Sequence, residues 1–321
     1  MGVLTVLWMV VKQIIKNWKL ELVLLLGLIL AVAVASSISI YTDGVLQLVM
    51  TDKWEGASSQ YHPPGAIKII DEQWRDYHPI LSDDGWRNQE EAFQQYQDLD
   101  QFFKKEVPKL YRTKQVHYYK MGQMDRESIK PLNPTEKNVR RYADVRFLTG
   151  LRDKVKVIAG CWFNSGENED KDNIYEVVID STARNELNLM LGKTYLYPKV
   201  EEEKKKQEYL KLKVVGVFKV KKEAYNKPVW IRRPPYKNTF FMSQVDFEKV
   251  VQRKDTKPYQ YEWFWVFDHE PIRVYQIPAK MKKLNQLETN AASISDSMRI
   301  TSTPLSSLQT VVEKSVVLKR L

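Results

Sequence analysis

Apolar residues are most concentrated in the first fifty positions of this 321-residue chain. Residues 22–40 contain no charged side chain. In a helix that rises about 1.5 Å per residue, this run spans about 28 Å, close to the roughly 30 Å hydrocarbon core of a bilayer. The pattern predicts one transmembrane helix over residues 20–42. Its membrane-spanning residues include Leu22, Leu26, Leu30, Val34 and Ile38.

The same segment also has features of a secretory signal peptide. Ala33-Val34-Ala35 has the small-x-small pattern of a cleavage site, and cleavage there would release a secreted enzyme that begins at Ser36. The stretch before the apolar run is long and itself largely apolar, unlike the short charged start of a signal peptide. Because the apolar segment also continues past the cleavage motif, we expect a retained anchor.

Residues 1–19 divide into two sides on a helical wheel. Lys12, Lys16 and Lys19 fall on one side, and Trp18 falls with several aliphatic residues on the other. This division predicts an amphipathic helix that lies in the membrane plane, with its lysines toward the lipid headgroups. A simple cytoplasmic lead-in is the alternative.

The orientation of the span follows from the charges at its two ends. Lys12, Lys16 and Lys19 precede the span, whereas only Lys53 follows it closely. Positively charged flanks stay on the cytoplasmic side. We therefore expect a cell-membrane protein with a cytoplasmic N-terminus and with residues from about 43 onward outside the cell.

The rest of the chain alternates strand-like and helix-like segments, which predicts an α+β fold. Strands are expected at residues 66–70, 114–121, 142–148, 154–160, 175–180, 193–197, 209–220, 239–242 and 261–268. Helices are expected at residues 86–109, 181–189, 243–251, 279–289 and 304–321. A boundary near residue 150 divides the domain into two subdomains, residues 43–150 and 151–300, before a final helical segment at residues 301–321.

Several single residues refine this pattern. Ser181 or Thr182 is expected to cap the helix at 181–189, with Gly192 as its C-terminal stop, and Ser243 to cap the helix at 243–251. Gly216 is expected at a bulge or a close-packing position. A polar loop with Pro131 and Pro134 is expected between the second and third strands, and residues 201–206 (EEEKKK) form a solvated hairpin tip.

Composition and charge limit the classes of partner. Lys and Arg number 50 against 40 Asp and Glu, which gives a formal net charge of +10. Anionic lipid headgroups or cell-wall polymers are the expected neighbours of such a surface. Residues 225–237 interleave aromatic and basic side chains, but no recognition helix accompanies them, so we expect no nucleic-acid partner. A single cysteine, Cys161, excludes an intramolecular disulfide and a zinc site with several thiolates.

Motifs for catalysis or cofactor binding are weak throughout. Gly192-Lys193-Thr194 imitates the end of a phosphate-binding loop, but Leu187 replaces the glycine that the loop requires. The histidines lack the spacing of metal ligands; they are His62, His78, His117 and His269. We therefore predict no catalytic residue, no cofactor and no metal site. The aromatic residues Trp263 and Trp265 are expected to belong to a packed strand.

Several segments occur in the order found in one family of membrane proteins. These segments are residues 151–160 (LRDKVKVIAG), 176–180 (EVVID), Ala183, 187–189, Leu191-Gly192 and 214–217 (VVGV). Together with the basic lead-in, the single span and the large following domain, they resemble the FtsX-like permeases of ABC transporters with a MacB-type extracytoplasmic core domain. The resemblance covers about residues 1–260. Cys161 and Lys193 depart from it, since the family often has Arg and Asp there.

This resemblance implies a role in transport. It implies a separate ABC ATPase subunit as partner, a homo- or heterodimer of permeases, and further spans that this chain does not contain. Residues 304–321 would be the stalk helix toward the second span, and Lys12, Lys16, Lys19 and Trp18 would lie where the membrane meets the ATPase. The substrate implied is amphiphilic or peptide-like. The alternative from the residues alone is a single-pass anchored binding or sensing module.

Overall fold

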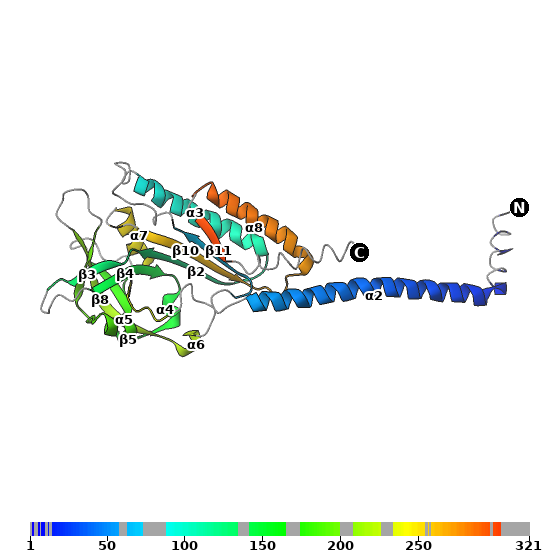
Figure 1. The fold of residues 1–321 in the computed structure, drawn as a ribbon, viewed down its shortest axis with the longest axis horizontal. Coiled ribbons are helices and arrows are strands. Elements are labelled where there is room, and N and C mark those ends of the chain that lie inside the picture. Colours follow the sequence, from blue (N-terminus) through cyan, green and yellow to red (C-terminus); the bar gives the residue numbers. More distant parts are fainter. Residues whose placement is uncertain are drawn as a thin grey trace. The chain divides into compact units, whose positions relative to one another are not determined.

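In the computed structural model the chain divides into two units (Figure 1). The first unit is Met1–Asp52 with Val311–Leu321, and the second is Lys53–Thr310. The residues described below are 2, 6, 8, 9, 12, 15–57, 63–72, 88–133, 141–164, 174–199, 208–225, 234–253, 256, 258–295 and 298–302. The predicted helix at residues 304–321, the hairpin tip at 201–206, His62 and His78 lie outside this set.

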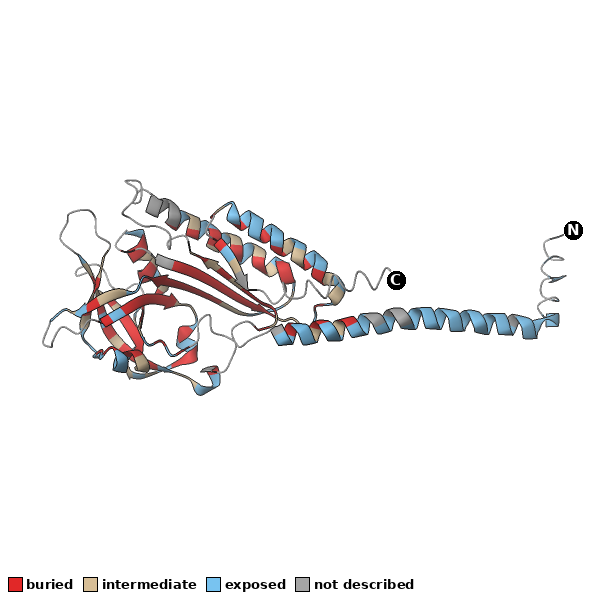
Figure 2. Cartoon of the chain, viewed as in Figure 1, coloured by how far each residue is buried: buried red, intermediate tan, exposed pale blue. Residues whose placement is uncertain are grey.

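One long helix dominates the first unit. α2 (Trp18–Ala57) has 40 residues, and its segment Trp18–Ser37 is long and apolar enough to cross a membrane. The apolar side chains of this segment are exposed all around the helix, as Figure 2 shows in pale blue. A helix that is apolar on every side is stable in lipid rather than in water. The helix confirms the predicted apolar element but continues past residue 42 to Ala57.

In the described residues of the second unit, eleven strands form one sheet. They are β1 (Ala66–Asp71), β2 (Gln115–Met124), β3 (Glu127–Pro131), β4 (Arg141–Leu148), β5 (Val155–Gly160), β6 (Ile174–Asp180), β7 (Thr194–Pro198), β8 (Tyr209–Val220), β9 (Thr239–Phe241), β10 (Pro258–Phe267) and β11 (Met298–Ser302). Their order is β11-β1-β10-β2-β4-β3-β7-β8-β6-β9, with β5 paired to β8. With the helices, this mixed sheet confirms the α+β class.

The pairing of β9 closes part of the sheet on itself. β9 pairs with β6 on one side and runs parallel to β4 on the other, with Val145 opposite Phe240. The strands β4, β3, β7, β8, β6 and β9 therefore form a closed ring, and β2, β10, β1 and β11 extend from it as an open sheet. Closure removes free edges from the ring and makes it stiff.

Helices cover one face of the open sheet. α3 (Asn88–Tyr111) and α8 (Ile277–Ala292) pack against each other there (Figure 1). The other helical elements are α4 (Leu151–Lys154), α5 (Ser181–Glu186), α6 (Lys222–Tyr225), α7 (Gln244–Gln252) and the 3-10 turn η1 (Val274–Gln276). The apolar periodicity at residues 86–109 correctly predicted α3, because its apolar side chains are the ones it buries.

The aromatic strand β10 lies at the centre of the core. Trp263 and Trp265 are at most 1% exposed, and the ring of Phe103 on α3 meets that of Trp263 edge to face at 5.2 Å between centroids. Tyr96 on α3 stacks on Tyr261 at 3.8 Å. These contacts confirm that Trp263 and Trp265 belong to a packed strand, and they bind α3 to the sheet.

Two local predictions were correct. The Ser243 hydroxyl accepts a hydrogen bond from the Asp246 backbone N–H at 3.0 Å and caps α7. Gly216 lies at a bulge between β6 and β8, and a β-carbon there would be 2.0 Å from the Cys161 carbonyl oxygen. Only glycine permits this approach of two backbones.

Other local predictions were wrong. The N-cap of α5 is Asp180, not Ser181 or Thr182, because its carboxylate accepts the Thr182 N–H at 2.7 Å while its own backbone remains extended. The helix ends at Glu186 rather than at residue 189, so Gly192 begins the approach to β7 instead of stopping the helix. Residues 127–131, expected in a loop, form β3.

The predicted boundary at residue 150 is crossed by strand pairs. β4 from the first predicted subdomain pairs with β9 from the second, and β10 lies between β1 and β2. β11, which the sequence did not reveal, completes the open edge beside β1. The division into two subdomains stays a prediction, and Lys53–Thr310 is described here as one unit.

Candidate functional site

The predicted membrane-spanning residues lie along the apolar half of α2. Leu22, Leu26, Leu30 and Val34 are between 48% and 57% exposed, as expected for side chains without a protein partner. Ile38 lies on the same helix, although its side chain is outside the described set. Burial of such side chains in lipid would contribute about 1.5–3 kcal/mol each, and their assignment to a membrane span stays a prediction.

The predicted interfacial residues lie on either side of a turn. Lys12 and Lys16 are helical, Asn17 lies in a turn, and Trp18 and Lys19 begin α2. The Leu20 N–H donates to the Asn17 carbonyl at 2.8 Å and closes this turn. All four predicted side chains are exposed, and Trp18 is 56% exposed. Their assignment to the membrane interface and to coupling stays a prediction.

The end of α2 contributes a residue that the sequence analysis did not single out. Trp54 belongs to the second unit and is 1% exposed. Its ring meets that of His269, which follows β10, at 5.6 Å between centroids. The last turn of α2 is therefore part of the packed second unit. The sequence signal for this buried contact was a large aromatic side chain near the end of an apolar helix.

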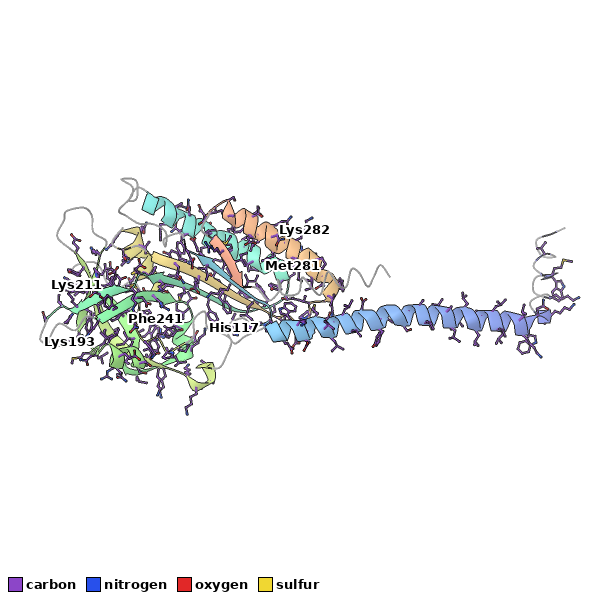
Figure 3. All side chains as sticks on the ribbon, viewed as in Figure 1. His117, Lys193, Lys211, Phe241, Met281 and Lys282 are labelled. Carbon is purple, nitrogen blue, oxygen red and sulfur yellow. The ribbon has the colours of Figure 1, made fainter. Side chains whose placement is uncertain are left out.

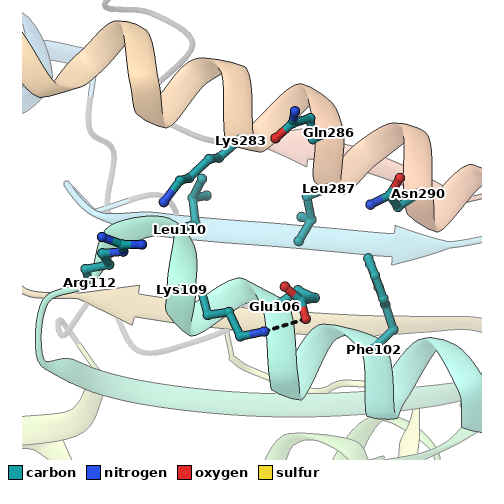
Figure 4. A pocket seen from close by; sticks show the side chains of 9 residues that line it. All are labelled: Phe102, Glu106, Lys109, Leu110, Arg112, Lys283, Gln286, Leu287 and Asn290. Atoms are coloured by element: carbon teal, nitrogen blue, oxygen red, sulfur yellow. Dashed lines mark hydrogen bonds and ion pairs between the residues drawn. The ribbon is translucent and has the colours of Figure 1, made fainter.

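A groove of about 240 Å³ lies between α3 and α8 (Figure 4). Its lining combines apolar, cationic and amide side chains: Phe102, Glu106, Lys109, Leu110, Arg112, Lys283, Gln286, Leu287 and Asn290. Two helices that pack at a shallow contact leave such a furrow between their exposed rows. The sequence analysis did not find it, because its two walls lie far apart along the chain.

Lys280 on α8 is hydrogen-bonded to the last turn of α3, the other wall of the groove. Its ammonium donates to the carbonyl oxygens of Tyr111, at 2.5 Å, and Leu110, at 3.4 Å. These are terminal carbonyls of α3, which a cation satisfies well. Burial lowers the pKa of Lys280, and the nearby charges of Lys283 and Arg112 lower it further. The end of the groove thus has a positive potential.

A buried charge network holds α3 on the sheet. Lys120 on β2 lies 3.1 Å from the Asp100 carboxylate, which also accepts the Trp263 indole N–H at 2.8 Å and an ammonium hydrogen of Lys104. Burial acts to raise the pKa of Asp100, but Lys120 and these hydrogen bonds lower it below its usual value. The carboxylate therefore stays ionised and paired.

The same network includes α7. Glu248 accepts hydrogen bonds from the Tyr96 hydroxyl, at 2.6 Å, and from the Gln244 amide, at 2.8 Å. Its carboxylate is 3.6 Å from the Lys120 ammonium. Burial lowers the pKa of Lys120, while Asp100 and Glu248 oppose that change. The arrangement fixes the positions of two helices through charged groups that are paired with one another, so its role is positioning.

Lys154 occupies a second buried position, on the opposite side of β2. Its ammonium lies 3.2 Å from the centroid of the Tyr119 ring. Burial lowers the pKa of Lys154 to about 7, and the charge of Asp153 opposes that change. Burial also raises the pKa of Tyr119, to about 12, so the phenol stays neutral.

The remaining candidates for chemistry are dispersed. Within the described ranges, no group of three or more His, Cys, Asp or Glu side chains is placed to hold a metal ion. The Tyr119 hydroxyl and the His117 Nδ1 are 3.2 Å apart, and His269 contacts Trp54. Cys161 is exposed beside β5. The lysine of the phosphate-loop imitation, Lys193, stands at the start of β7, far along the surface from the groove (Figure 3).

Twelve solved protein chains are similar to this chain in structure, and two of them follow. No model of a known protein family matches the chain, and no curated protein matches it. The periplasmic region of MacB from Actinobacillus actinomycetemcomitans aligns with 78% of this chain and 92% of that chain, at 10% identity and a TM-score of 0.38. A domain assigned to a permease protein of Porphyromonas gingivalis aligns with 71% and 82%, at 10% identity and a TM-score of 0.33. Similarity at this level does not by itself define a shared fold.

Proposed function

We propose that this chain is a permease subunit of an ABC transporter, or the N-terminal part of one, with the second unit outside the cell. The observation that carries the proposal is the continuity of α2. Its first half is apolar and exposed, and its last turn belongs to the second unit, where Trp54 is buried. A single stiff helix is suited to pass movement from a membrane span to the domain that follows it.

The segments that resemble the FtsX-like family support this proposal by their arrangement. β5, which ends the segment at residues 151–160, and β6, which contains residues 176–180, both pair with β8. The Gly192 N–H donates to the Val214 carbonyl on the same strand at 2.7 Å. The resembling segments thus meet around one strand, as parts of a common structural element would.

The proposed mechanism is mechanical. An ATPase subunit on the cytoplasmic side would move the membrane spans, and Lys12, Lys16, Lys19 and Trp18 would lie at the interface where that force enters. The permeases would act as a homo- or heterodimer on an amphiphilic or peptide-like substrate. The closed strand ring and the buried Lys120 network make the second unit rigid enough to move as one body.

Affinity capture tests this proposal. The tagged full chain is expressed in its native membranes, extracted in a mild detergent and captured, and its companions are identified by mass spectrometry. We expect an ATPase subunit and further membrane spans, on this chain or a companion. A variant with Lys12, Lys16 and Lys19 changed to Glu should lose the ATPase, whereas the matched Lys-to-Arg variant should retain it. A chain captured without any ATPase would contradict the proposal.

A second candidate function is a single-pass anchored binding or sensing module. The groove between α3 and α8 favours it, because a concave site with an apolar floor and a few polar side chains is typical of ligand binding. This candidate predicts capture of the chain without an ATPase and with ligand-dependent stability. The two functions are therefore distinguished by the same capture experiment.

A further inference from the structure

The groove between α3 and α8 has a cationic end. Arg112 follows the last turn of α3, and Lys283 comes from α8; Figure 4 shows both charged groups at the same end of the groove. Within the described part of the chain, neither side chain has an ion-pair partner. The third cation of the lining, Lys109, is paired with Glu106 at 2.7 Å. The unpaired positive charge is therefore concentrated at Arg112 and Lys283.

The other end of the groove is mainly apolar. Figure 4 shows Phe102 and Leu287 there, with Asn290 at the rim, and Leu110 lies nearer the cationic end. Leu110 and Leu287 in the floor are 3% and 6% exposed, so they are held by the core and each contributes only a small apolar area to the groove. An apolar chain laid along this end would remove water from its own surface and from the half-buried Phe102, at about 25 cal/mol per Å².

The size of the groove limits what it can hold. Its volume of about 240 Å³ is below the roughly 300–1,000 Å³ of pockets for drug-sized ligands. A narrow, unbranched chain is a ligand that suits a furrow of this volume. The groove has positive charge at one end and apolar surface at the other. A matching ligand therefore has a charged end and an apolar end.

We propose that the groove between α3 and α8 binds a single-chain anionic amphiphile, an acyl chain with a carboxylate head. The carboxylate would lie between Arg112 and Lys283, and the chain would extend past Leu110 toward Leu287 and Phe102. Arg112 suits this role because its planar guanidinium donates two parallel hydrogen bonds to a carboxylate. This inference rests on the second candidate function, ligand binding at this groove, and names its ligand; it does not depend on the coupling mechanism, which does not use this surface.

Local electrostatics agree with an anionic head at this position. Lys280, Lys283 and Arg112 are three cations around the end of α3. The carboxylate of the lining, Glu106, is paired with Lys109 and not with these cations. A bound anion would reduce the mutual repulsion of these cations. The ammonium of Lys280 is held by carbonyl oxygens, so it supports the field without blocking the groove.

The test uses the full chain in nanodiscs of zwitterionic lipid and decanoate with a terminal diazirine as the probe. Illumination attaches the probe covalently, and mass spectrometry of peptides locates it. We expect attachment to α3 and α8 near Phe102 and Leu287 that saturates with probe concentration. Unlabelled decanoate should compete, whereas decyltrimethylammonium and acetate should not.

Two pairs of variants provide the controls. Lys283→Glu should weaken decanoate binding at least about tenfold, whereas Lys282→Glu, at the neighbouring exposed position on α8 (Figure 3), should change it less than about twofold. Gln286→Trp should fill the groove and abolish attachment there, whereas Asn285→Trp, exposed outside the lining, should not.

Several outcomes would overturn the proposal. Equal effects of Lys283→Glu and Lys282→Glu would show that net charge, not the groove, attracts the probe. Equal competition by decyltrimethylammonium would show simple apolar partition. Competition by an acidic peptide would assign the groove to a protein partner, and attachment that requires anionic lipid in the nanodisc would assign the basic end to a membrane surface.

Discussion

The ammonium of Lys120 lies 3.1 Å from the carboxylate of Asp100, across the contact between β2 and α3, and the Lys120 side chain is 3% exposed. A second cation, Lys104, holds the same carboxylate at 2.8 Å from the solvent side, where its own side chain is 53% exposed. One carboxylate thus has a buried and an exposed ion pair. The contributions of a buried and an exposed ion pair to stability can therefore be compared at a single carboxylate.

Loss of the buried pair should cost far more stability than loss of the exposed one. Lys120→Met leaves the Asp100 and Glu248 carboxylates without their shared cation and should lower the free energy of unfolding by about 3 kcal/mol. Lys104→Met should lower it by less than about 1 kcal/mol. Denaturant unfolding of the full chain in detergent, followed by tryptophan fluorescence, measures both. Equal costs would show that Lys120 does not serve as the buried counter-ion.

Stability should depend on pH through Lys154. Its pKa is about 7 in the folded chain, because burial disfavours the charged form, and about 10.4 in an unfolded chain. Between these values the unfolded state binds more protons, so the free energy of unfolding rises with pH above about 7. From pH 7 to pH 9 the rise due to this group should be about 2 kcal/mol.

The matched variant for this prediction is Lys154→Met, which keeps the length of the side chain and removes its titration. Unfolding free energies of the two proteins at pH 7 and pH 9 give the contribution of Lys154 by difference. A pH dependence that persists unchanged in Lys154→Met would assign it to other groups.

Two glycine substitutions should differ because of their surroundings. Gly216→Ala places a methyl group 2.0 Å from the Cys161 carbonyl oxygen and must separate β5 from β8. We expect a loss of about 3 kcal/mol in the free energy of unfolding. Gly192→Ala has no atom within 4 Å of its new methyl group but keeps a φ of +79°, so its cost should be about 1 kcal/mol. A smaller loss for Gly216→Ala than for Gly192→Ala would contradict the close approach.

The single cysteine provides a test of orientation. Cys161 is exposed, and a membrane-impermeant maleimide should label it in intact cells if the second unit lies outside. Changing Lys12, Lys16 and Lys19 to Glu should reduce this labelling by at least about twofold, because it removes the positive charge that retains the N-terminus inside. The matched Lys-to-Arg variant should label like the parent. Labelling only after the cells are lysed would place the second unit inside.

The sequence was most informative where a local pattern determines structure. The apolar period of α3 and the serine cap of α7 each arise from interactions within a few residues, so their positions were predictable. The cap of α5 failed because Asp180 belongs both to β6 and to the helix start. Propensity does not show that the last residue of a strand also caps the following helix, since its carboxylate accepts the helix N–H only where the strand has ended.

The arrangement of the sheet and the groove was not predictable for a different reason. β4 pairs with β9, and Arg112 and Lys283 line the same groove, although the members of each pair lie far apart along the chain. Periodicity specifies which face of an element is buried but not which element covers it. The long apolar helix, in contrast, was predictable from residues 22–40 alone, because a helix forms its backbone hydrogen bonds within its own segment.

The position of β1 has a consequence for biosynthesis. Both of its neighbours, β10 and β11, come from the far end of the second unit. At about 5–20 residues per second, the ribosome finishes β1 roughly ten seconds or more before β10 emerges. During that interval the apolar segment Ala66–Asp71 has two open edges, which is the state most prone to intermolecular pairing. A chaperone that shields this segment until translation ends would therefore determine the yield of native protein.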